Sequence, residues 1–261
     1  FVIGLHLGVG GAAEATVIAQ YVSGIGIAIY TLSHFSQVRS IWNIHCLKRE
    51  RIHEIISFST LTCVQQSVMN LGILMVQGLV NSFGPIVMAA FAAGVKIDAF
   101  AYMPVQDFGN AFSTFIAQNY GARKNDRIRS GLKSAVCISM TFCIVISALV
   151  FIFAKPLMSI FIDANEIEII QEGVRYLRIE GAFYCGIGYL FLLYGLYRAL
   201  GKPGMSVVLT VISLGTRVVL AYLLSSIVGV CGIWWSVPIG WILADITGLF
   251  YYKVKKKELL F

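Results

Sequence analysis

Charged residues are scarce in this 261-residue chain: only 13% are Asp, Glu, Lys or Arg, whereas 58% are hydrophobic. Charged side chains make up about a quarter of an ordinary soluble protein, so an ordinary soluble domain is excluded, as is a disordered or collagen-like chain. The mean hydropathy is +0.80, and this apolar surplus is more than one soluble core buries. The composition predicts a polytopic membrane protein surrounded by lipid.

The sequence also lacks the patterns that carry metal sites, disulfides and enzymatic chemistry. Its six Cys form no CxxC pair, and its four His show no metal-ligand spacing. No metal, no organic cofactor and no catalytic residue are therefore expected, and no nucleophile lies near a base, so an enzyme is not expected. A net charge of +7 has no charge-rich soluble domain to carry it, so no nucleic-acid partner is expected.

Crossing the hydrocarbon core takes about 20 mostly apolar residues. Seven runs of this kind are bounded by charge, and they predict an all-α membrane protein with seven transmembrane helices. The runs are Gly8–Leu32, Ile55–Val80, Pro85–Phe108 with a polar continuation to Tyr120, Ala135–Ala154, Gly181–Tyr197, Met205–Ile227 and Gly232–Tyr252.

Most Lys and Arg fall into alternate loops, which predicts that these loops and the C-terminus are cytoplasmic and that the chain lies in a plasma membrane. The basic groups on that side are Arg39 to Arg51, Arg123 to Lys133, Arg198 with Lys202, and Lys253 to Lys257. Residues 34–54 differ from the spans, because apolar residues recur there at helical spacing among basic ones. We expect an amphipathic segment at the cytoplasmic interface, with a solvated linker as the alternative.

The first and last spans open alike, with Gly8-Val9-Gly10-Gly11 and Gly229-Val230-Cys231-Gly232, at an offset of 221 residues. Such an echo is typical of transporters built from two repeats. It predicts that residues 1–33 are the last helix of one six-helix lobe, 34–54 a linker, 55–252 a second six-helix lobe and 253–261 a basic tail. The chain starts at Phe1 inside apolar sequence, so we interpret it as a fragment of a longer protein.

Three stretches carry a specific resemblance. Residues 89–122 contain Met103-Pro104 and end in Gln118-Asn119-Tyr120-Gly121-Ala122, and they are followed by Leu200-Gly201-Lys202-Pro203 and by Ile233-Trp234-Trp235-Ser236-Val237-Pro238. Together they resemble the eighth helix, the segment between helices ten and eleven, and the twelfth helix of the multidrug and toxic compound extrusion (MATE) family.

The resemblance runs from the family's sixth helix to its end and is closest to its bacterial, proton-coupled-type branch. It implies a twelve-helix antiporter whose two lobes face a central cavity and which exports small organic, chiefly cationic, compounds in exchange for H+ or Na+. It also implies a missing N-terminal lobe and a place in a bacterial inner membrane. A flippase of lipid-linked oligosaccharides or peptidoglycan precursors from the same superfamily is the alternative.

Ionisable groups inside a span are costly, roughly 2.5–3.5 kcal/mol at a helix centre, and each is a functional hypothesis. Lys96 and Asp98 lie about 200° apart around one helix, so they are not a simple pair and each needs a partner elsewhere. We predict that Asp98 reaches the cavity, or else joins a structural pair. Arg217 and Asp245 are candidate structural or coupling residues, as is Glu180 at the outer end of the fifth span.

Polar side chains follow one face of the third span at Asp107, Asn110, Thr114 and Gln118. A polar stripe of this length is expensive against lipid, so we expect it to line the cavity. Pro104 removes a backbone donor beside it and predicts a kink.

Two further groups are candidates for the cavity wall. The second span places Gln66, Asn70 and Gln77 on one face, either to bind substrate or to hold helices together. Tyr184 and Tyr189 suit cation–π contact with an organic cation, or plain packing.

Overall fold

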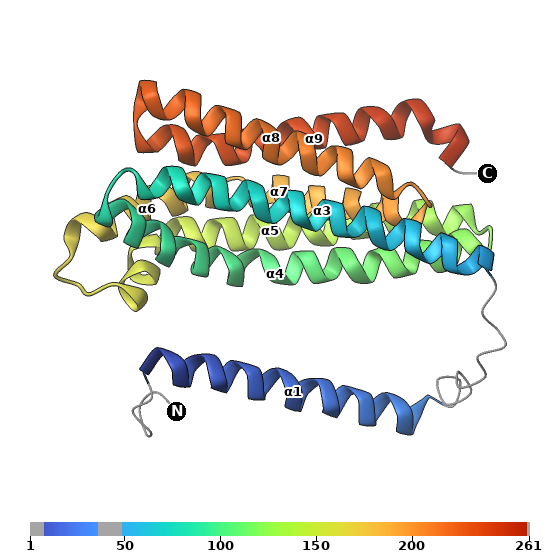
Figure 1. Ribbon diagram of the computed structural model, residues 1–261. Helices are drawn as coiled ribbons and strands as arrows, with labels where there is room; N and C mark the ends of the chain where they lie inside the picture. Colours follow the sequence, from blue (N-terminus) through green and yellow to red (C-terminus); the bar gives the residue numbers. More distant parts are fainter. Residues whose placement is uncertain (1–7, 36–48, 260–261) are drawn as a thin grey trace. The chain divides into compact units, whose positions relative to one another are not determined.

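The computed structural model describes residues 8–35 and 49–259, and every regular element within them is a helix (Figure 1). The all-α prediction is confirmed. The helices are α1 (Gly8–His34), α3 (Arg49–Asn81), α4 (Pro85–Gly121), α5 (Asn125–Phe161), α6 (Ile167–Gly181), α7 (Tyr184–Ala199), α8 (Pro203–Val228) and α9 (Val230–Leu259).

The chain divides into two units, Phe1–Ile56 and Ser57–Phe261. In the first unit, α1 exposes large apolar side chains such as Tyr21 and Val22, as a lipid-facing helix does. Most of the predicted amphipathic segment 34–54 lies outside the described residues. In the second unit, α9 continues to Leu259, so the predicted basic tail begins within a helix.

Six helices are long and apolar enough to cross a membrane alone, and α6 with α7 forms a pair bent by 50° that passes the same test together. Counting the pair once, the described residues hold the seven predicted spans. The fifth differs from the prediction, because it begins at Ile167 and not at Gly181. An apolar-run search misses α6 because that helix is amphipathic: Ile170 and Leu177 are buried while Glu168 and Arg175 are exposed.

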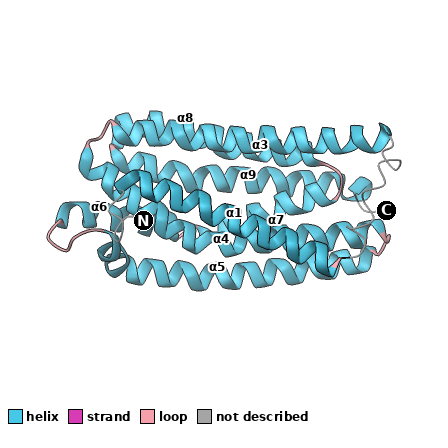
Figure 2. Ribbon diagram, turned by 60° about the horizontal axis from the view of Figure 1, so that its bottom comes forward, coloured by secondary structure: helices cyan, strands magenta, loops and turns pink. Residues whose placement is uncertain are grey.

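Close helix contacts within the second unit depend on glycine. α4 packs along α7 (Figure 2), and a Cβ added at Gly195 of α7 would lie 2.6 Å from the backbone oxygen of Gly109 in α4. Only glycine, which has no Cβ, allows the two backbones to approach each other this closely. α8 and α9 form a hairpin that turns at Gly229, whose φ of 65° favours glycine.

The buried side chains of the second unit form two clusters. One surrounds Tyr176 and Trp234, and the other surrounds Tyr197 and Trp241. α4 runs through Pro104 as one helix from Pro85 to Gly121. Helical backbone is interrupted instead in α5, at Phe153, three residues before Pro156. The predicted kink near Pro104 stays a prediction.

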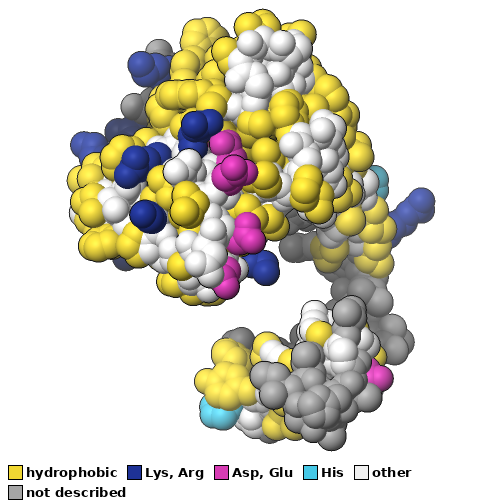
Figure 3. Space-filling view, turned by 90° about the vertical axis from the view of Figure 1, so that its left-hand side faces the viewer, with side chains coloured by type: hydrophobic (Ala, Val, Ile, Leu, Met, Phe, Trp, Pro, Cys, Tyr) yellow, Lys and Arg dark blue, Asp and Glu magenta, His cyan; other side chains and the backbone are white. Residues whose placement is uncertain are grey.

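The end of the second unit at the start of α6 carries acidic side chains on its surface (Figure 3). Asp163, Glu166 and Glu168 are exposed there, in the loop and the first turn of α6. Negative groups at this place are favoured by the dipole of the helix N-terminus.

Replacing Gly195 by Ala tests the α4–α7 contact. We expect Gly195→Ala to lower the free energy of unfolding by about 1–3 kcal/mol, because the new methyl meets backbone that cannot move aside. Gly215→Ala in α8 is the matched control, since a Cβ there meets nothing within 4 Å. Thermal unfolding of the purified variants in detergent, followed by circular dichroism, measures both, and equal midpoints would contradict the close contact.

Candidate functional site

Asp98 lies sealed inside the second unit, with only 3% of its surface exposed. Tyr176 of α6 and Tyr184 of α7 donate their hydroxyl groups to its carboxylate, one to each oxygen. Gly94, one turn earlier on α4, leaves the space that the ring of Tyr176 fills. A carboxylate held by two hydroxyl donors is the arrangement that a buried acid needs.

A second carboxyl group lies beside the first. Glu180, in the last turn of α6, is 4% exposed and lies near enough to Asp98 and Tyr176 to interact with both. The sequence places Glu180 three residues after Leu177 and ten after Ile170, on the buried face of α6. The bend between α6 and α7 therefore turns Glu180 into the unit, although its position in the sequence suggested the outer end of a span.

Arg217 of α8 is a cation close to this acid cluster, and its charge acts on both Glu180 and Tyr102. Its Nε is buried with no hydrogen-bond partner among the described residues. Lys96 points the other way and is exposed on α4, as the 200° separation from Asp98 predicts. The candidates Asp98 and Glu180, scattered in the sequence, thus come together, and Arg217 lies near enough for its charge to act on Glu180.

Asp245 stays apart from this cluster. No ion pair joins Asp245 to Arg217 in the described residues, and the carboxyl of Asp245 faces Gly186 of α7, with Oδ1 buried and unpartnered there. Since α8 and α9 are antiparallel neighbours, the two residues occupy different levels of the hairpin. The two residues therefore do not pair with each other in the described part of the chain, and their structural or coupling roles stay predictions.

The remaining candidates divide between the open surface and the interior. The polar residues of α3 and α4 are exposed on the second unit, and their place in a cavity wall stays a prediction: Gln66, Asn70, Gln77, Asp107, Asn110, Thr114 and Gln118. Tyr189 lines a largely apolar cavity of about 290 Å³ with Leu132 and Leu193. Tyr184 is buried and engaged with Asp98, so it is not free for cation–π contact with a substrate.

Sequence reasoning missed two functional candidates, Tyr176 and Arg198. Tyr176 lies outside the predicted spans because the apolar run of the fifth begins only at Gly181, although the 3.6-residue period of residues 167–181 marks a helix. Arg198 was assigned to a cytoplasmic loop, but it lies in the last turn of α7, and its side chain donates to Asn110 Oδ1 on α4 over 3.2 Å. No pattern in the sequence predicts the contact between Arg198 and Asn110.

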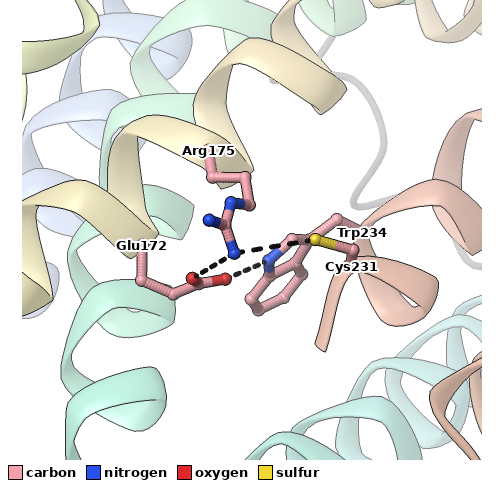
Figure 4. A network of polar contacts seen from close by, with 4 residues as sticks. All are labelled: Glu172, Arg175, Cys231 and Trp234. Atoms are coloured by element: carbon pink, nitrogen blue, oxygen red, sulfur yellow. Dashed lines mark hydrogen bonds and ion pairs between the residues drawn. The ribbon is translucent and has the colours of Figure 1, made fainter. Parts of the chain in front are cut away.

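A polar network ties α6 to α9 next to the acid cluster (Figure 4). Trp234 Nε1 donates to Glu172 Oε1 at 2.9 Å, and Arg175 Nη1 lies 3.2 Å from Glu172 Oε2 and 3.8 Å from Cys231 Sγ. The ring of Trp234 also packs against Tyr176, with 4.8 Å between the ring centroids. The network therefore holds in place the helix that supplies Tyr176 and Glu180.

The described residues hold no group of three or more His, Cys, Asp or Glu side chains that could bind a metal ion. They form a bundle of membrane-spanning helices with carboxyl groups and an arginine inside it, and with the exposed polar residues of α3 and α4 on its surface. This combination defines a multi-pass membrane protein of the transporter class.

Comparison with known proteins identifies the family. The model of the MatE family matches residues 62–223, so the chain belongs to the MATE family, whose members are transporters and not enzymes. The chain is 26% identical over 254 residues to a probable multidrug resistance protein, YpnP, of Bacillus subtilis, covering 97% of this chain and 56% of the relative. It is 23% identical to a probable multidrug resistance protein, NorM, of Thermotoga maritima, covering 88% and 49%.

Solved structures agree with the fold. A crystal structure of a mutant of the Vibrio cholerae MATE transporter VcmN matches 98% of this chain and 58% of its own, with a TM-score of 0.84 and 24% identity. The chain spans about half the length of the curated relatives that it matches.

Trp234→Phe tests the network between α6 and α9. The variant keeps an aromatic ring but removes the donor to Glu172, and hydrogen bonds to charged groups contribute about 1.5–3 kcal/mol, so we expect a lower unfolding midpoint. Trp235→Phe is the matched control, because Trp235 is 44% exposed and donates no hydrogen bond to Glu172. Equal thermal stability of the two variants in detergent would show that the network does not stabilise the fold.

Proposed function

We propose that the chain is the C-terminal lobe, with the sixth helix of the N-terminal lobe, of a secondary active transporter. The complete transporter exports organic cations, drugs or other toxic compounds by alternating access between two lobes. Family membership supports this proposal, and so does the match to about half of each relative. Flipping of lipid-linked precursors is not favoured, because the curated relatives named above are described as multidrug resistance proteins.

The proposal for the coupling ion rests on the buried acid pair of Asp98 and Glu180. Two carboxyl groups that lie near each other and are buried together repel each other if both are charged, so such a pair favours keeping one proton. Asp98 and Glu180 meet this description. We therefore propose H+ and not Na+ as the ion that this lobe exchanges.

The donors around the pair favour a proton for a second reason. A sodium site surrounds the ion with lone pairs, whereas Tyr176 and Tyr184 direct O–H groups at Asp98. Two hydroxyl donors stabilise the carboxylate after its proton has left.

The open polar row carries the proposal for the substrate side. Asp107 is exposed on α4, in the stripe that continues through Asn110 and Thr114. A carboxylate on a helix face that is not in contact with lipid can attract an organic cation. In the orientation that we propose, the basic loops and the C-terminus face the cytoplasm of a bacterial cell.

Neutralising the acid pair tests proton coupling. In proteoliposomes with the complete transporter that we propose, Asp98→Asn and Glu180→Gln should each slow efflux of a lipophilic cation dye, driven by a pH gradient, roughly tenfold or more, because a proton-relay group is lost. Dye fluorescence follows efflux, and a pH-sensitive dye follows the proton.

Glu168→Gln is the control, since it removes the same charge from an exposed position on α6. It should transport like the wild type. Wild-type rates in both buried variants, at equal protein content, would show that this acid pair does not couple transport. Efflux driven by a sodium gradient alone would show that the ion is Na+.

A further inference from the structure

A second polar site lies on the second unit, apart from the acid pair. A cavity of about 190 Å³ opens between α3, α4 and α7, and it is lined by Thr62, Gln65, Gln66, Met69, Gln106, Asn110, Phe191, Tyr194 and Arg198. Asn110 lies 12 residues after Asp98 on α4, which places this cavity about 18 Å along the helix from the buried carboxyls.

Arg198 is the charged residue of this cavity. Its Nε donates to the backbone oxygen of Tyr194 at 3.3 Å and its Nη2 to Asn110 Oδ1 at 3.2 Å. A guanidinium group has five N–H donors in a rigid fork, so three are left without a protein partner in the described part of the chain. Fork-shaped donors match carboxylate and phosphate oxygens, which accept two parallel bonds.

No carboxylate among the described residues forms an ion pair with this arginine. Asp107 lies one turn before Asn110 on α4, yet within that part of the chain it makes no such pair with Arg198 either. The other polar wall groups are neutral, and four of them are side-chain amides that can donate N–H groups: Gln65, Gln66, Gln106 and Asn110. The site thus offers one positive charge and several donors to whatever enters.

One wall of the site is held in position before any ligand binds. Gln65 is buried and donates from Nε2 to Thr210 Oγ1 of α8 at 3.0 Å. Arg198 is fixed by its bonds to both α7 and α4. A purely structural role for Arg198, as the cation at the C-terminus of α7, accounts for the bond to Tyr194, but not for a fork that faces a polar cavity.

We propose that this cavity, centred on Arg198 with Asn110 and Gln66, is a binding subsite for an anionic group, a carboxylate or phosphate, of the transported molecule. The inference rests on the proposed transport function and specifies one property of the substrates: some of the transported molecules carry an acid group. Binding is measured without any ion gradient, so the failure of proton coupling would leave the subsite standing.

The test compares a fluorescent xanthene dye that carries a free carboxylate with its ethyl ester, in which an ethyl group takes the place of the negative charge. Fluorescence anisotropy gives the dissociation constant of each dye for the purified chain in nonionic detergent. We expect the wild type to bind the acid roughly tenfold more tightly, because charge-assisted hydrogen bonds to Arg198 are lost with the ester. Inorganic phosphate should displace the acid.

Arg198→Gln should erase the preference between the two dyes, and Arg198→Lys should keep part of it. Lys133→Gln on α5, an exposed position, removes the same charge elsewhere and should keep the preference whole. Where Arg198→Gln loses its helical content, Gln66→Glu gives the answer instead, since a carboxylate opposite the guanidinium should also erase the preference.

Three results would overturn the proposal. The first is that the wild type binds both dyes equally. The second is that the preference for the acid survives in Arg198→Gln or Gln66→Glu. The third is that Arg198→Gln, still helical, weakens the binding of both dyes alike, which is the signature of a structural role. Displacement of the acid dye by phosphatidylglycerol but not by phosphate would assign the site to a lipid headgroup, and would equally overturn its assignment to the substrate.

Discussion

The second unit is organised around the burial of one carboxyl group, Asp98, in a helix that crosses a membrane. An acid at such a place is tolerated only when other groups meet it. The bent pair of α6 and α7 supplies these groups, with a tyrosine hydroxyl from each arm and a second carboxyl from the end of α6. The bend is therefore the feature that makes the acid pair possible.

Much of the fold follows from the sequence, because crossing lipid imposes an apolar run of fixed length on each helix. The all-helical class and the seven spans are confirmed on this basis. The start of the fifth span at Ile167 is the exception, since α6 buries only one face and its charged residues break the apolar run. The family was identified from the residues between Ala89 and Ala122 and from two shorter motifs, and the match to residues 62–223 confirms it.

The site was less predictable, because its members meet only after the helices pack. Asp98 was recognised as costly and in need of a partner, but nothing in the sequence joins it to Tyr176, 78 positions away. The exposed faces of α3 and α4 were predictable, since helical spacing alone decides which residues share a face.

Two polar sites share the same two helices. α4 supplies Asp98 to one and Asn110 to the other, while α7 supplies Tyr184 and Arg198. Gly109 and Gly195 bring the backbones of these helices into contact, so movement of either helix acts on both sites.

The central claim is that the two buried carboxyl groups of Asp98 and Glu180 share one proton. Infrared difference spectroscopy of the purified chain tests it most directly, because a protonated carboxyl has a carbonyl stretch that a carboxylate lacks. The account predicts this band in the wild type near neutral pH, and its loss in the Asp98→Asn, Glu180→Gln double variant. A wild-type spectrum without the band, or a band that persists in the double variant, would contradict it.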